Sequence, residues 1–268
     1  MSISPKGIAV VTGASAGIGA VYADRLARRG YDLLLVARNQ ARLDQLAKRI
    51  AGATGRVVRT VAADLNNKAD LKRIETIVAT DPGITMLVNN AGVGALEPLL
   101  QSDVDAMEEM ISLNVTALMR LTYAAAPALV SRGGGTIINI ASAVAIAPEI
   151  LNGVYGGTKA FVLALGQSLH KELADKNVRI QTVLPGATAT HFWEAAGGAV
   201  DNLPASMVMR SDDLVDAALA GFDQGETVTI PSLPDAADWA SYEAARQTLM
   251  PNLSLSSVPL RYRTAAAA

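Results

Sequence analysis

Short apolar segments alternate with longer amphipathic ones along most of this chain, and this alternation limits the possible folds more than any other feature. Seven short apolar runs, several of them rich in β-branched residues, predict strands: 8–12, 32–36, 57–63, 86–90, 136–142, 178–185 and 226–231. Six segments between them predict helices: 17–29, 39–51, 67–79, 103–130, 154–175 and 211–222. Strand–helix alternation of this kind is typical of a parallel sheet with helices on both sides. We therefore predict an α/β fold with about seven parallel strands.

The composition favours one large core and excludes several kinds of protein. Half of the 268 residues are hydrophobic, and no stretch resembles a linker or a repeat, so we expect a single domain over 1–268. The net charge of -2 gives no reason to expect a nucleic acid or a membrane surface as a partner. The chain has no cysteine and two histidines, which excludes disulfides and argues against a metal site. These features are compatible with a soluble protein of the cytoplasm.

A glycine-rich segment, "TGASAGIG" (12–19), follows the first predicted strand and opens the first predicted helix. Gly13, Gly17 and Gly19 let the backbone turn tightly and approach a phosphate, and the free N–H groups at the helix start favour an anion. The spacing differs from the standard dinucleotide-binding fingerprint. The segment indicates phosphate binding, and close packing of helix on strand without a ligand is the alternative.

The second strand ends at Ala37 and Arg38, where NAD-binding folds usually carry an acidic residue for the adenosine ribose. Arginine cannot accept that hydrogen bond, but its planar fork suits a 2′-phosphate. The sequence therefore favours NADP(H) over NAD(H), with an ordinary surface arginine as the alternative. Asp64, at the end of the third strand, could accept a hydrogen bond from adenine or simply form a turn.

Tyr155 and Lys159 stand four positions apart at the start of the predicted helix 154–175. This spacing places both side chains on one face about a turn apart. A tyrosine can donate a proton, and a nearby ammonium group favours the phenolate and lowers the tyrosine pKa. Because the same spacing occurs on many solvated helices, the pair alone does not establish a function.

Taken in order, these motifs and a few others resemble the short-chain dehydrogenase/reductase family. The residues that carry the resemblance lie between 8 and 190: Thr12 to Gly19, Asn89-Asn90-Ala91-Gly92, Asn114, Ser142, Tyr155-x-x-x-Lys159 and Pro185-Gly186. The unusual glycine spacing is the family's own variant. The resemblance implies a Rossmann-type doubly wound sheet. It also implies an NADP(H)-dependent oxidoreductase that moves a hydride between the nicotinamide and a ketone or secondary alcohol.

The resemblance also implies roles for individual residues. The catalytic set would be Asn114, Ser142, Tyr155 and Lys159. Ser142 would polarise the substrate oxygen, Lys159 would also bind the nicotinamide ribose, and Asn114 would hold a water in a proton relay that ends at Lys159. The residues implied around the cofactor are Gly13, Ser15, Gly17, Ile18, Gly19, Arg38, Asp64, Leu65, Asn90, Ala91, Gly92, Tyr155, Lys159, Pro185, Gly186, Thr188 and Thr190.

Within the single domain we expect a cofactor-binding and catalytic core over 5–186, a substrate lid over 187–210, and a C-terminal helix, last strand and tail over 211–268. The lid segment contains Phe192, Trp193 and the run Met207, Val208 and Met209 in a chain with few aromatic residues. This content favours a hydrophobic or aromatic ketone as the small-molecule substrate. A helical pair that only caps the core is the alternative, and His191 is interpreted as a lid or surface residue.

Two further expectations concern assembly and rival functions. Apolar residues Phe161, Leu165 and Leu169 form an extra face on helix 154–175, and family members pair the helices equivalent to 103–130 and 154–175. The resemblance thus implies a homo-oligomer, a tetramer or dimer, although helix 103–130 of the same chain is an alternative cover. The rival functions are an NAD(H)-dependent alcohol dehydrogenase and a non-catalytic dinucleotide-binding regulator.

The predicted helix 103–130 contains Pro127, which removes a backbone donor. We therefore predict a kink or an early end in this helix.

Overall fold

The main sheet is parallel throughout and has seven strands within residues 6–190 and 192–263, which the computed structural model describes. In spatial order the strands are β3 (Val58–Ala62), β2 (Asp32–Ala37), β1 (Ile8–Thr12), β4 (Ile84–Asn89), β5 (Gly135–Ile140), β6 (Val178–Val183) and β9 (Val228–Thr229). The predicted fold class is thereby confirmed. The strand order reverses between β1 and β4, which is where open sheets of this kind bind ligands.

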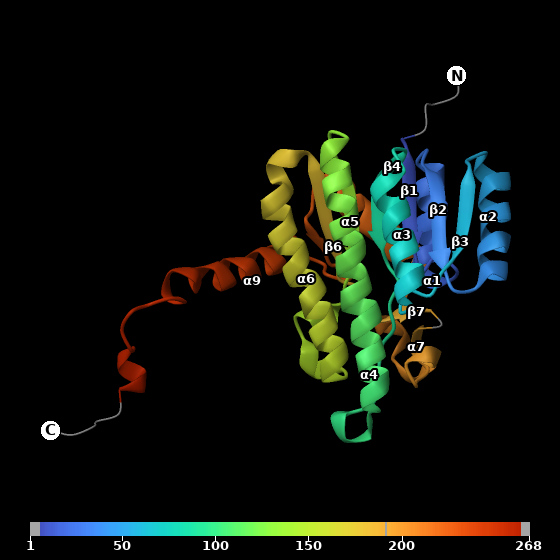
Figure 1. Cartoon of the computed structure of the whole chain (residues 1–268). Coiled ribbons are helices and arrows are strands. Elements are labelled where there is room, and N and C mark those ends of the chain that lie inside the picture. The colour runs from blue at the N-terminus through green and yellow to red at the C-terminus, as the bar shows by residue number, and fades with distance from the viewer. Residues whose placement is uncertain (1–5, 191, 264–268) are drawn as a thin grey trace. The chain divides into compact units, whose positions relative to one another are not determined.

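Helices cover both faces of the sheet (Figure 1). One face carries α1 (Gly17–Arg28), α2 (Gln40–Thr54) and α8 (Ser211–Gln224), and the other carries α3 (Lys68–Thr80), α5 (Leu118–Ser131) and α6 (Gly153–Leu173). Leu26, Leu43 and Leu214 are buried on the first face, and Ile74 and Leu121 on the second. Because both faces are covered, the central strands are apolar without alternation.

The predicted helix 103–130 consists of three consecutive parts. These are α4 (Val104–Ile111), a π-helical segment (Ser112–Ala117) and α5. The early end predicted from Pro127 is wrong, because α5 continues to Ser131. Leu121 and Leu129 are buried on either side of Pro127, so packing offsets the lost hydrogen bond.

This helix, Val104–Ser131, is also long and apolar enough to cross a membrane by length and composition alone. Of its most apolar window, 44% is buried inside the structure. Leu118, Leu121 and Leu129 belong to this buried part. A helix packed in this way on a sheet is a core helix.

A small second sheet joins the two ends of the segment expected to be a lid. Its strands β7 (Thr188–Ala189) and β8 (Met209–Arg210) pair in parallel, which the sequence does not predict. Between them lie α7 (Phe192–Ala195) and two single 3-10 turns, Val200–Asn202 and Ala205–Met207. His191 lies outside the described residues.

The chain divides into two compact units, Met1–Ser232 and Leu233–Ala268. The sequence predicts one domain over 1–268, whereas the structure separates the last segment. That segment contains α9 (Ala236–Thr248), which the sequence does not predict. None of its described residues is buried, so this unit has no core of its own. Leu253 and Leu260 are among its exposed apolar side chains.

Candidate active site

The predicted site residues gather around two adjoining cavities at the carboxyl edge of the sheet. The first cavity, of about 720 Å³, is lined by these of the predicted residues: Gly17, Ile18, Asn90, Gly92, Ser142, Tyr155, Lys159, Pro185, Gly186, Thr188 and Thr190. The second, of about 750 Å³, is lined by Gly13, Ser15, Arg38, Asp64, Leu65, Ala91 and Gly92. Gly92 and Val93 line both cavities, so the two are neighbours. Only Gly19 and Asn114 of the predicted set lie outside the described lining.

The glycine turn between β1 and α1 is held against the end of β4. Gly13 has a φ of +64°, and a Cβ there would lie 2.8 Å from the side-chain nitrogen of Asn90. That nitrogen donates hydrogen bonds to the carbonyl oxygens of Thr12 (2.9 Å) and Gly13 (3.2 Å). A Cβ at Gly19 would meet the same nitrogen at 2.5 Å. Gly19 therefore makes room for the amide that shapes the turn.

The start of α1 is suited to an anion. Ala16 precedes the helix and has no side chain that could cap the free N–H groups, and the first turn carries no acidic residue. Free N–H groups together with the helix dipole attract a phosphate. Gly17 has a φ of +53° and lines the first cavity. Because it has no side chain, it does not cover the backbone there. The turn fits the diphosphate of a dinucleotide.

The second cavity has two cations at its edge. Arg38 and Arg42 both line it, and neither has an ion-pair partner among the residues that the structure describes. Asn39 caps α2 by accepting the Arg42 N–H at 3.0 Å, which places Arg42 in the first turn of that helix. Sequence reasoning missed Arg42, although its position four residues after Arg38 was the available signal.

Asp64 lies in this second cavity and also forms a turn. Its carboxylate accepts the Asn66 N–H at 3.0 Å, and its own N–H donates to Asp70 at 2.9 Å. Both interpretations of Asp64 from the sequence are thus compatible with the geometry.

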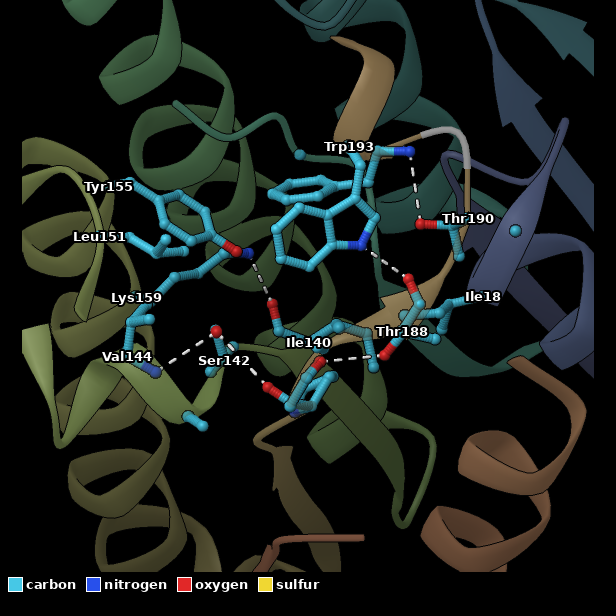
Figure 2. Close-up of a pocket in the computed structure, with 18 of the residues that line it drawn as sticks. Ile18, Ile140, Ser142, Val144, Leu151, Tyr155, Lys159, Thr188, Thr190 and Trp193 are labelled. Atoms are coloured by element: carbon cyan, nitrogen blue, oxygen red, sulfur yellow. Dashed lines mark hydrogen bonds between the residues drawn. The ribbon is translucent and has the colours of Figure 1, made fainter. Parts of the chain in front are cut away.

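Ser142, Tyr155 and Lys159 converge on the first cavity from two elements (Figure 2). Tyr155 and Lys159 belong to the first two turns of α6, which begins because Asn152 accepts the N–H groups of Val154 (2.8 Å) and Tyr155 (3.3 Å). Ser142 follows β5, and its hydroxyl accepts the Val144 N–H at 3.3 Å and donates to the carbonyl oxygen of Pro185 at 3.4 Å. The side chains of Tyr155 and Lys159 are almost fully buried.

The electrostatics of this group differ from the prediction. We predict from the sequence that Lys159 lowers the pKa of Tyr155. In the structure burial raises the pKa of Tyr155 to about 12, and the hydrogen bond from Ser142 opposes this only in part. Lys159 instead donates to the carbonyl oxygen of Ile140 at 3.1 Å, and burial lowers its own pKa to about 8. The site therefore holds a neutral phenol that keeps its proton at neutral pH.

Asn114 lies in the π-helical segment, and both polar atoms of its side-chain amide are hydrogen-bonded. Its oxygen accepts the Val93 N–H at 2.9 Å, and its nitrogen donates to the carbonyl oxygen of Val93 (2.8 Å) and the hydroxyl of Thr158 (3.2 Å). A Cβ at Gly92 would lie 3.0 Å from the Asn114 oxygen and 3.5 Å from the Lys159 nitrogen. Asn114 thus anchors the loop after β4 beside Lys159, and the water relay stays a prediction.

The segment 187–210, which the sequence predicts to be a lid, supplies apolar walls for the first cavity. Phe192, Trp193, Leu203 and Met207 line it, whereas Met209 packs against the core. The Trp193 ring nitrogen donates to the carbonyl oxygen of Thr188 at 2.8 Å, so this ring presents only carbon to the cavity (Figure 2). Val144, Ile150 and Leu151 add further apolar lining to the cavity.

Comparisons with known proteins show what this chain is similar to. A family model described as short chain dehydrogenase matches residues 7–199. A solved short-chain dehydrogenase from Sphingobium yanoikuyae in complex with NADPH is 47% identical, with a TM-score of 0.93, and the match covers 96% of this chain and 100% of that one. The bulky-bulky ketone specific alcohol dehydrogenase from Comamonas testosteroni is 41% identical with a TM-score of 0.88, over 98% of this chain and 99% of that one. An uncharacterized oxidoreductase from Staphylococcus epidermidis is 35% identical over 188 residues, 70% of this chain and 80% of its own length.

Proposed function

This chain belongs to the short-chain dehydrogenase/reductase family, and we propose that it is an NADP(H)-dependent oxidoreductase that interconverts bulky apolar ketones and their secondary alcohols. The observation that carries the proposal is the meeting of Ser142, Tyr155 and Lys159 in an apolar cavity that adjoins a second cavity edged by Arg38. An apolar pocket with a few convergent polar groups is the usual form of a small-molecule site.

The two cavities fit the two halves of a dinucleotide. The turn from Gly13 to Gly19 would hold the diphosphate, and Lys159 would bind the nicotinamide ribose. Arg38, Arg42 and Ser15 would hold the 2′-phosphate, because guanidinium groups bind phosphate oxygens through paired hydrogen bonds. The similar Sphingobium yanoikuyae enzyme was solved with NADPH, which supports this choice. When bound, the nicotinamide supplies the hydride in reduction and accepts it in oxidation.

The side chains at the end of β5 and the start of α6 would manage the proton. The hydroxyl groups of Ser142 and Tyr155 would hold the ketone oxygen by hydrogen bonds and polarise it. Tyr155 would then give its phenolic proton to that oxygen as negative charge develops there. Because burial raises the pKa of Tyr155, the phenol is protonated at neutral pH and is ready to donate its proton. Lys159 would stabilise the resulting phenolate.

The cavity walls support a bulky, apolar substrate. Val144, Leu151, Phe192 and Trp193 offer carbon surfaces around Tyr155, so a ketone with large substituents would bury apolar area. The name of the Comamonas testosteroni enzyme points to the same class.

The proposal is tested with the purified chain, NADPH or NADH, and a panel of ketones, by following the absorbance of the reduced nicotinamide. Acetone and acetophenone form one comparison, and propiophenone adds bulk on the second side. We expect a kcat/KM for the aromatic ketones at least about tenfold higher than for acetone, which corresponds to about 1.4 kcal/mol of apolar burial. Binding of NADPH without reduction of any ketone would contradict the proposal and favour a dinucleotide-binding regulator.

A further inference from the structure

We infer that Phe192 is a positioning residue for Tyr155, held against its ring by a slot that exists because residue 94 is glycine. This inference rests on the proposed function, since it assigns to Phe192 the task of orienting the proton donor of that site. Phe192 and Tyr155 come from different elements, α7 of the lid and α6 of the core.

The slot is a close approach between Gly94 and the ring of Phe192. A Cβ added at residue 94 would lie 2.1 Å from Cζ, 2.7 Å from Cε2 and 3.1 Å from Cε1 of that ring. Real Cβ atoms do not come this near to a ring, so any other residue at 94 would displace Phe192. Gly94 is not among the glycines with positive φ. The backbone therefore does not require glycine here, and the space for the ring does.

On its other side, the Phe192 ring packs against the proton donor. The ring centres of Phe192 and Tyr155 are 5.7 Å apart with an angle of 45° between the planes. Tyr155 belongs to a small buried cluster with Ala95, Met110 and Val144, and Phe192 packs against this cluster. Of the residues in and around this cluster, Phe192 is the one that comes from the lid.

A second close approach fastens the same two segments together. A Cβ at Gly198 would lie 2.4 Å from Cδ1 of Leu96, and Gly198 likewise is not among the glycines with positive φ. The Gly198 N–H donates to the carbonyl oxygen of Trp193 at 2.8 Å. The loop at 93–96 and the lid thus meet at two places. At each place a glycine of one segment leaves room for a large side chain of the other, and these two contacts hold Phe192 in position.

This arrangement predicts a defined consequence for catalysis. A phenol must point at the ketone oxygen, and a displacement of about 1 Å can reduce turnover about a hundredfold. Phe192 lines the first cavity beside Tyr155. The residues proposed to hold the diphosphate and the 2′-phosphate are different ones. Loss of the ring should therefore lower kcat and leave the affinity for NADPH unchanged.

The test uses Gly94→Ala, Phe192→Ala, Phe192→Leu and the double variant Gly94→Ala with Phe192→Ala. Gly52→Ala is the matched control, because a Cβ at Gly52 meets nothing within 4 Å. We expect Gly94→Ala and Phe192→Ala each to lower kcat about tenfold or more, with Phe192→Leu between them and the unmodified chain. The dissociation constant for NADPH, measured by its fluorescence, should change less than about twofold. The double variant should be no slower than Phe192→Ala alone, because Gly94 acts through the ring. Effects that multiply in the double variant would overturn the inference.

A second readout needs no turnover. In chain labelled with ¹³C-tyrosine, the NMR signal of Tyr155 is assigned by its loss in Tyr155→Phe. We expect it to move in Phe192→Ala and in Gly94→Ala, and to stay in place in Gly52→Ala. An unmoved signal in the first two variants would overturn the inference. An unmodified chain that reduces no ketone would defeat the proposed function instead, and the NMR comparison would still decide whether the ring of Phe192 packs against that of Tyr155.

Discussion

The Lys159 ammonium nitrogen lies 5.8 Å from the centre of the Tyr155 ring, and both side chains are buried. Burial disfavours the charged form of each group, so the phenol holds its proton tightly and the ammonium releases its proton more easily than usual. Such a pair is poised to donate a proton to a ketone oxygen. The reverse reaction requires the phenolate, so oxidation of the alcohol should be favoured by alkaline pH.

Replacing Tyr155 with Phe removes the transferable proton and little else. We expect kcat for ketone reduction to fall at least about a hundredfold, because general acid catalysis contributes roughly 10²–10⁴. The affinity for NADPH, measured by fluorescence titration, should stay within about twofold. Retention of more than a few per cent of the activity would show that another group donates the proton.

Replacing Lys159 with Met should stabilise the fold in a pH-dependent manner. The folded-state pKa of about 8 lies below the ordinary 10.5, so the buried ammonium destabilises the folded chain below pH 8, and this cost vanishes above 10.5. The cost corresponds to about 3 kcal/mol at pH 7. Lys159→Met should therefore raise the unfolding temperature by several degrees at pH 7 and by much less at pH 10.5.

The matched control for this measurement is Lys48→Met, which changes an exposed lysine of α2. Its effect on the unfolding temperature, measured at the same two pH values, is the baseline for the comparison. An equal stabilisation by Lys159→Met at both pH values would contradict the assigned cost of burial. Lys159→Met should also weaken turnover and cofactor binding, because Lys159 is proposed to contact the ribose.

Cofactor choice should depend on the residues at the end of β2. A charge-assisted contact to a 2′-phosphate is worth about 1.5–3 kcal/mol, or about ten- to a hundredfold in affinity. We expect NADPH to be preferred over NADH by at least that order in kcat/KM. Arg38→Ala should weaken NADPH and spare NADH, and Ala37→Asp should reverse the preference, because its carboxylate repels the phosphate and accepts the ribose hydroxyl.

Arg42→Ala should act in the same direction as Arg38→Ala, since both side chains line the second cavity. Arg49→Ala is the control, because Arg49 is exposed on the same helix and is not part of the described lining. Steady-state kinetics with both cofactors on one ketone measures the preference. Equal efficiency with NADPH and NADH in the unmodified chain would contradict the assignment.

Assembly into a dimer or tetramer remains a prediction from the family. Leu165 and Leu169 pack against the buried cluster that includes residues of α5, so the alternative cover within the same chain accounts for them. Tyr123 of α5 is 65% exposed and Phe161 of α6 is only partly buried, which leaves an apolar surface on this helix pair. We expect light scattering to show a dimer or tetramer and Tyr123→Asp to weaken it. A monomer of the unmodified chain at micromolar concentration would contradict the prediction.

The sequence by itself determined those features that depend on local patterns. Alternating periods of apolar residues predict the strands and helices, because burial on both faces of a sheet imposes uninterrupted apolar runs on its strands. The glycine turn, Arg38 after β2 and the spacing of Tyr155 and Lys159 are likewise visible in short stretches. A local motif suffices there because the chemistry of phosphate binding and of a tyrosine–lysine pair needs residues that are close in the sequence.

Only the tertiary structure decided features that depend on contacts between distant segments. The pKa of Tyr155 is raised rather than lowered, because desolvation by α4, the loop after β4 and α7 outweighs the effect of Ser142. The Lys159 ammonium is directed at the carbonyl oxygen of Ile140 instead. The continuation of α5 past Pro127 depends in the same way on packing against the sheet. In the sequence, Gly94 is an ordinary loop glycine. In the structure, the ring of Phe192, nearly a hundred residues later, occupies the space that a side chain at residue 94 would need. Burial and steric fit are properties of the assembled chain, so no short stretch of sequence contains them.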